Sequence, residues 1–147
     1  MKIIKLRKPY FPEENIQRIQ KKISESLRNG QLTLGKNVEV FERGFCRYTR
    51  SKFGSGVSSA TAGLHISLLS LGVRKNDEVI VPAKTFISTA NAAVYCNAKP
   101  IFCDVQEDTF QIDPEKIRKL ITKKTKAIIA VHLGGNVCDM KEILEIS

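Results

Sequence analysis

The sequence predicts an α/β fold in which a mostly parallel β-sheet carries helices on both of its faces. Two observations predict this class. Short segments that are apolar throughout, such as Val79–Val81 and Ala127–Val131, alternate along the chain with stretches of helical periodicity. Strands without polar positions are typical of sheets that are covered on both sides. Such an alternation of strands and helices indicates parallel strands joined by crossover helices.

Two helices are expected ahead of the sheet. Pro12, followed by two glutamates, opens an amphipathic pattern that stops at Gly30. We therefore predict that residues 1–50 form an N-terminal helical segment and that the sheet lies in residues 51–147. The apolar positions of the second helix are Val38, Phe41, Phe45 and Tyr48.

The elements of the second segment follow from the apolar runs and the residues that end them. Gly72 is suited to stop a helix, and Pro82 to close a strand. Asp113, followed by a proline and a glutamate, forms a helix start. The expected order is strand 56–57, helix 61–71, strand 78–81, helix 88–96, strand 100–105, helix 113–121, strand 126–131 and a helix from 139 onward.

The most informative segment lies between the first of these strands and its helix. It consists of hydroxylated residues among small ones: Ser58, Ser59, Ala60, Thr61, Ala62 and Gly63. A helix N-terminus presents free backbone N–H groups, and small side chains leave room for a ligand, so the segment predicts a phosphate-binding turn. The same pattern also fits an ordinary helix N-cap, which stays open as an alternative.

Other polar residues follow the expected strands. In parallel sheets ligands bind at the carboxyl ends of the strands, which makes the loops 58–61, 82–88, 104–109 and 132–139 the candidates. His132 ends an apolar strand, and we interpret it as structural, with a catalytic role as the alternative. His65 is expected to pack, and the carboxylates Asp104 and Asp139 are expected to be structural.

The composition is that of one globular domain, with 147 residues, 27% charged and 42% hydrophobic. The net charge of +9 is concentrated in residues 1–50, which hold 12 Lys or Arg and 5 Asp or Glu. Such a surface can be a solvated face or can meet an anionic small substrate. Nucleic acid is not expected as a partner, because no RNP-type, helix-turn-helix or zinc-finger pattern accompanies the charge.

Location and metal binding are inferred from what the sequence lacks. No apolar run approaches the roughly 18 residues of a membrane span, and no membrane partner is expected. Met1–Lys8 is basic without the apolar core of a secretory signal, so we expect a cytoplasmic protein. The cysteines are widely spaced, so reduced thiols and no metal site are expected; they are Cys46, Cys96, Cys103 and Cys138.

Four segments together resemble the N-terminal part of the DegT/DnrJ/EryC1/StrS family, which comprises sugar aminotransferases that depend on pyridoxal 5′-phosphate (PLP). Their order and spacing match the family over essentially the whole chain. The resemblance implies the N-terminal part of the large domain of the aspartate aminotransferase-like fold (fold-type I), with residues 51–147 as the first part of a PLP-binding domain. The segments are GKNVEVFE (35–42), VSSATAGLH (57–65), DEVIVPAKTF (77–86) and KTKAIIAVHLGG (124–135).

The resemblance also implies a cofactor site. It places Thr61 and the neighbouring residues Ser59, Ala60 and Ala62 at the 5′-phosphate of PLP, and Phe86 against the pyridine ring. Stacking suits a planar ring, and a helix N-terminus suits a phosphate dianion. The alternative for Phe86 is a core aromatic beneath the sheet.

No catalytic residue is expected within this chain. In the family, the Schiff-base lysine and the aspartate that contacts the pyridine nitrogen come later, beyond the position of Ser147. Lys84 lies close to Phe86 in sequence but does not match the position of the family's lysine. Because residues 141–147 have a helical pattern without a stop signal, we expect the domain to be truncated at its C-terminus.

The implied activity is transfer of an amino group, with glutamate as the expected donor, to a nucleotide-linked keto-sugar in amino-sugar or surface-polysaccharide biosynthesis. A homodimer is expected, and this chain alone is expected to be inactive. One alternative is a non-catalytic remnant or subunit piece that binds PLP or protein weakly. Another is an unrelated nucleotide-binding α/β domain, although the G-x-G-x-x-G and Walker patterns are missing.

Overall fold

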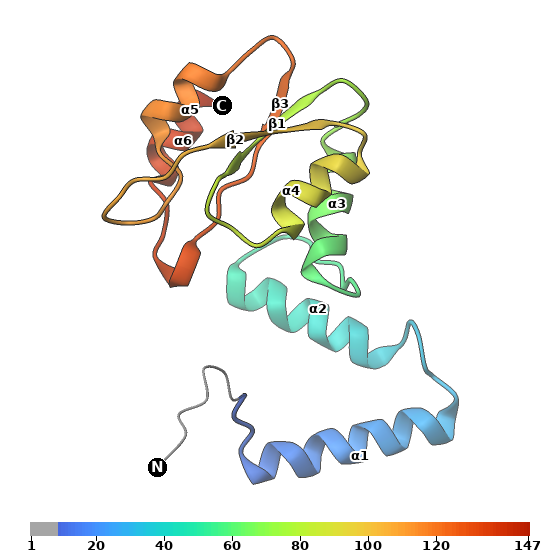
Figure 1. Ribbon diagram of the computed structural model, residues 1–147. Coiled ribbons are helices and arrows are strands. Elements are labelled where there is room, and N and C mark those ends of the chain that lie inside the picture. Colours follow the sequence, from blue (N-terminus) through green and yellow to red (C-terminus); the bar gives the residue numbers. More distant parts are fainter. Residues whose placement is uncertain (1–8) are drawn as a thin grey trace, which may run out of the picture. The chain divides into compact units, whose positions relative to one another are not determined.

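The structure, a computed structural model, describes residues 9–147 (Figure 1). The basic segment Met1–Lys8, used above to predict the location, lies outside the described residues. The chain divides into two compact units between Gly56 and Val57. The assignment of residues 51–147 to a PLP-binding domain stays a prediction.

Within its described residues, the first unit contains two helices, α1 (Glu13–Asn29) and α2 (Lys36–Thr49), as predicted. Gly30 ends α1 in the left-handed region at φ +68°, where a side chain would be strained. No residue of either helix is buried. Polar contacts connect them: Lys22 Nζ donates to Asn37 Oδ1 at 3.2 Å, and Asn37 Nδ2 donates to Ser26 Oγ at 3.1 Å.

The second unit contains a three-stranded parallel sheet, which confirms the predicted fold class. The strands are β1 (Glu78–Pro82), β2 (Lys99–Cys103) and β3 (Thr125–Ile128), in the spatial order β2-β1-β3. Ile80 of the central strand pairs with Ile101 on one side and Ile128 on the other.

Helices cover both faces of this sheet (Figure 1). On one face lie α3 (Ala60–Ser70) and α4 (Ser88–Tyr95), and on the other lie α5 (Pro114–Leu120) and α6 (Met140–Ile146). A short 3₁₀ turn spans Leu133–Gly135.

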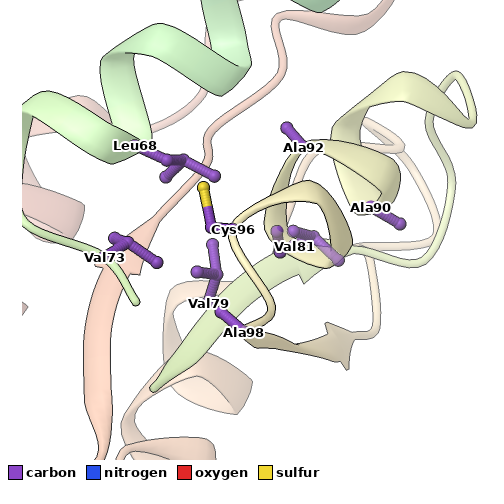
Figure 2. Close-up of a cluster of buried hydrophobic side chains, with 9 residues drawn as sticks. Leu68, Val73, Val79, Val81, Ala90, Ala92, Cys96 and Ala98 are labelled. Atoms are coloured by element: carbon purple, nitrogen blue, oxygen red, sulfur yellow. The ribbon is translucent and has the colours of Figure 1, made fainter. Parts of the chain in front are cut away.

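Each face has its own core because successive side chains of a strand point in opposite directions. Val79 and Val81 of β1 pack with Leu68 of α3 and the alanines of α4 (Figure 2). Ile80, between them in sequence, packs on the other face with Ile117 and Ile143 of α5 and α6. The prediction that the strands are buried on both sides is therefore confirmed for β1, whereas the edge strands β2 and β3 are only partly buried.

Three predicted strands differ from the structure. Gly56–Val57 is not a strand, because the part of the chain that the structure describes offers it no strand to pair with. The strand predicted over 100–105 is Lys99–Cys103, and Val105 forms only an isolated antiparallel bridge with Ile112. The strand predicted over 126–131 ends at Ile128, although the Ile129 N–H still donates to the Ile80 carbonyl at 2.9 Å. Apolar runs thus extend past the ladder itself.

The predicted helices are confirmed to within a residue or two at their ends. Gly72, at φ +76°, follows α3, and the Val73 N–H returns to the Leu68 carbonyl at 3.0 Å. Asp113 and Asp139 cap α5 and α6 by accepting from first-turn N–H groups. Within residues 9–147 no helix has the length and apolar character needed to cross a membrane.

Candidate functional site

The predicted phosphate turn forms the N-terminus of α3. Ser59 is the N-cap in an extended conformation, and its Oγ accepts from the Ala62 N–H at 3.2 Å. The first-turn amides of a helix have no intrahelical acceptor, so the N–H groups of Ala60 and Thr61 remain available to a ligand. Ser59 and Ala60 are exposed, while Thr61 and Ala62 are half-buried. The four predicted residues therefore lie together at one helix end.

A second helix N-terminus meets this one through a side-chain contact. Thr61 Oγ1 lies 2.8 Å from the hydroxyl oxygen of Ser88, the first residue of α4, across a sequence separation of 27 residues. Ser88 is 8% exposed. The hydrogen bond holds the starts of α3 and α4 next to each other at the end of β1.

These two helix ends differ in charge from the other helix ends of the described chain. Neither α3 nor α4 has an acidic residue in its first turn, whereas α1, α2, α5 and α6 each have at least one glutamate there. An acidic side chain in the first turn offsets the positive end of the helix dipole. The joined ends of α3 and α4 thus keep their positive potential, which favours an anion.

Phe86 lies in the connection from β1 to α4, two residues before Ser88. Its side chain is 73% exposed, so the alternative of a core aromatic beneath the sheet is wrong. An exposed aromatic ring next to the paired helix ends can cover a flat ring whose phosphate is held at α3.

Lys84 and the histidines have other partners. Lys84 Nζ lies 3.2 Å from the centroid of the Phe110 ring, a cation–π contact between the loops after β1 and β2. His132 accepts the Cys138 backbone N–H at its Nδ1, at 3.1 Å, which gives the ring a structural contact. His65 packs edge-on against Tyr95, with ring centroids 5.6 Å apart.

Gln111 is a residue that the sequence reasoning missed. It is 2% exposed, and its amide binds both backbone groups of Leu133: Nε2 donates to the carbonyl at 3.2 Å, and Oε1 accepts the N–H at 3.3 Å. Oε1 also accepts from the Cys138 thiol at 3.2 Å. Gln111 therefore links the loops that follow β2 and β3. Ser88 was missed as well, and neither residue stands in a motif that would single it out.

The carboxylates have structural contacts. Asp104 accepts from Lys116 Nζ at 2.9 Å, which lowers the pKa of the exposed Asp104 carboxyl and raises the pKa of Lys116. Asp139 caps α6. Within residues 9–147, no three His, Cys, Asp or Glu side chains lie close enough together to hold a metal ion.

The cysteines are free thiols. Cys96, Cys103 and Cys138 are buried, and Cys46 in α2 is partly exposed. Burial, with the negative charge of Asp113 nearby, raises the pKa of Cys103 to about 11. Burial also raises the pKa of Cys96.

Comparison with known proteins shows what this arrangement is similar to. Residues 13–147 match the profile of the DegT/DnrJ/EryC1/StrS aminotransferase family. The chain is 41% identical over 140 residues to MJ1066 of Methanocaldococcus jannaschii and 39% identical over 139 residues to the spore coat polysaccharide biosynthesis protein SpsC of Bacillus subtilis. Each match covers 95% of this chain and 35% of the relative, so the chain spans about a third of their length.

A solved structure has a similar fold. The crystal structure of NtdA from Bacillus subtilis, with bound cofactor PMP (pyridoxamine 5′-phosphate), is 38% identical and has a TM-score of 0.88. The similarity covers 92% of this chain and 31% of NtdA.

Proposed function

The chain belongs to the DegT/DnrJ/EryC1/StrS aminotransferase family, and from this premise we propose that it forms the phosphate-binding part of a PLP-dependent sugar aminotransferase. We propose that the whole enzyme transfers an amino group from glutamate to a nucleotide-linked keto-sugar. Amino-sugar or surface-polysaccharide biosynthesis is the proposed setting, which the similarity to SpsC supports. A cytoplasmic location is part of the proposal.

One observation carries the assignment of the cofactor site. Two helix ends without acidic first-turn residues are joined by the Thr61–Ser88 hydrogen bond, and Phe86 is exposed beside them. The N–H groups of Ala60 and Thr61 are free for phosphate oxygens, and the ring of Phe86 is free for stacking. The residues present therefore fit a phosphorylated, flat heterocycle.

Each residue has a separate task in this proposal. Ser59 fixes the first turn of α3, the amides of Ala60 and Thr61 together with the Thr61 hydroxyl bind the phosphate, and Phe86 orients the ring. When bound, PLP supplies the electron sink that amino transfer requires. No side chain of this group can take up or release a proton near neutral pH, so we propose that the chain alone binds the cofactor but does not turn over substrate.

Binding of PMP by the 147-residue chain tests this proposal. PMP lacks the aldehyde that would react with surface lysines, and its fluorescence reports binding directly. We expect saturable binding, weakened roughly tenfold by Thr61→Val, because a hydrogen bond to a charged group is lost. Ser70→Ala, at the other end of α3, is the matched control and should bind like the wild type. A wild-type chain that does not bind PMP would contradict the proposal.

A second role, association with another subunit, is supported by the first unit. Three apolar side chains of α1 are exposed, and they line a hollow of about 480 Å³ within this unit: Ile19, Ile23 and Leu27. Apolar surface of this kind is usually covered by protein. We propose that this surface forms part of a homodimer interface in the whole enzyme. Light scattering compares the apparent mass of the Ile23→Glu variant with that of the wild type. We expect a lower mass for the variant, because a charge at this position disfavours association.

A further inference from the structure

We propose that Ser88 is a positioning residue that turns the Thr61 hydroxyl into a hydrogen-bond donor for the phosphate of the cofactor. This inference rests on the proposed function and concerns the direction of one hydrogen bond. The structure gives the two oxygens at 2.8 Å, and either atom could donate. Burial and the partners of each hydroxyl decide which one does.

The Ser88 hydroxyl has to donate to Thr61. Ser88 is 8% exposed, so its hydrogen needs an acceptor within the protein. Within residues 9–147, Thr61 Oγ1 is the hydrogen-bond partner of its side chain. A serine in a helix can instead donate to the carbonyl four residues earlier, as Thr49 does to Phe45 in α2, but Ser88 makes no such bond. Thr61 therefore accepts from Ser88.

The hydrogen of Thr61 is then left for a ligand. A hydroxyl carries one hydrogen and can accept through its lone pairs at the same time. Because Thr61 is half-buried and accepts from the inner side, its own O–H can point outward at the N-terminus of α3. A phosphate dianion offers only acceptors, so a hydroxyl whose donor is directed outward matches it. Ser88 need not touch the ligand for this effect.

A neighbouring pair of hydroxyls provides the control. Thr89, one residue after Ser88, is 4% exposed, and its Oγ1 lies 2.8 Å from Thr85 Oγ1. It has the same burial and the same kind of partner as Ser88, but it is not bonded to Thr61. Thr89→Val should thus lower stability as Ser88→Ala does, without a specific effect on the phosphate.

The experiment compares PMP with pyridoxamine, which lacks the phosphate, on the full 147-residue chain. We expect Ser88→Ala to weaken the binding of PMP about fivefold and to leave the binding of pyridoxamine unchanged, because only the phosphate contact is affected. Thr89→Val should keep the ratio of the two affinities at its wild-type value. A double variant decides whether Ser88 acts through Thr61: in the Thr61→Val background, Ser88→Ala should have no further effect on PMP.

The outcomes separate the two proposals. If the wild type binds PMP and Ser88→Ala binds it equally well, or if the two substitutions add, the role of Ser88 is refuted while the cofactor site stands. If the wild type does not bind PMP, both are refuted. If circular dichroism shows that the Ser88→Ala variant is unfolded, Ser88→Cys replaces it, because a thiol has nearly the size of the hydroxyl but is a weaker donor. The Ser88→Cys variant is then expected to lose affinity for PMP and to keep its affinity for pyridoxamine.

Discussion

The two units of this chain use apolar side chains with opposite outcomes. In the second unit, Val79, Ile80 and Val81 of the central strand are completely buried between two layers of helices. In the first unit, no residue of α1 or α2 is buried, and Ile23 is 55% exposed. The comparison teaches that spacing predicts which side of a helix is apolar, whereas burial requires a complementary surface. A sheet provides two such surfaces.

The largest expected effect comes from the same substitution made in both units. Ile80→Ala should lower the free energy of unfolding by about 3–4 kcal/mol, because it leaves a cavity in a closed core. Ile23→Ala, at a half-exposed position, should cost less than about 1 kcal/mol. Urea titration followed by circular dichroism measures both. Equal losses of unfolding free energy would show that the surface around Ile23 is covered by protein in solution.

The cysteines allow a chemical form of the comparison. Iodoacetamide at pH 8 should modify Cys46 of the first unit well before Cys103 of the second. Cys103 is buried and has a pKa of about 11, so about one thiol in a thousand is ionised at that pH. Mass spectrometry of the peptides over time gives the order, and 6 M urea should remove the difference. Fast labelling of Cys103 in the native chain would mean that its core opens readily.

The smallest effects concern the helix ends. Asp113 caps α5 with its side chain, whereas α2 starts at Gly35 without a side-chain cap. Asp113→Ala should cost about 1 kcal/mol, and Gly35→Asp should gain a few tenths, because glycine is already a tolerable cap. Thermal unfolding measures both, and a loss on Gly35→Asp would contradict the extended conformation at that residue.

Much of the fold follows from the sequence. Apolar periodicity, together with Gly30, Gly72 and the Asp113–Pro114 pair, gives the ends of α1, α3, α4 and α5 to within a residue, and it also indicates α2 and α6. The strand predicted at Gly56–Val57 is wrong because a strand forms only by pairing with a neighbouring strand. The sequence of these two residues does not show whether such a neighbour exists.

The candidate site could be predicted only in part. Residues 59–62 and Phe86 follow from a local pattern and a family resemblance. Ser88 and Gln111 do not, because their importance comes from partners 27 and 22 residues away and from burial. Serine and glutamine are ordinary residues in any helix or loop, and the sequence carries no sign of which hydroxyl or amide will be enclosed.

The Gln111 amide has a consequence for the architecture. By giving one hydrogen bond to Leu133 and taking another from it, the side chain reproduces the exchange that a peptide group makes in a β-ladder. It acts as one extra rung beyond the end of β3, built without a strand. The two loops that follow β2 and β3 are therefore held in a fixed position relative to each other. We expect insertions or deletions in either loop to be tolerated only away from Gln111 and Leu133.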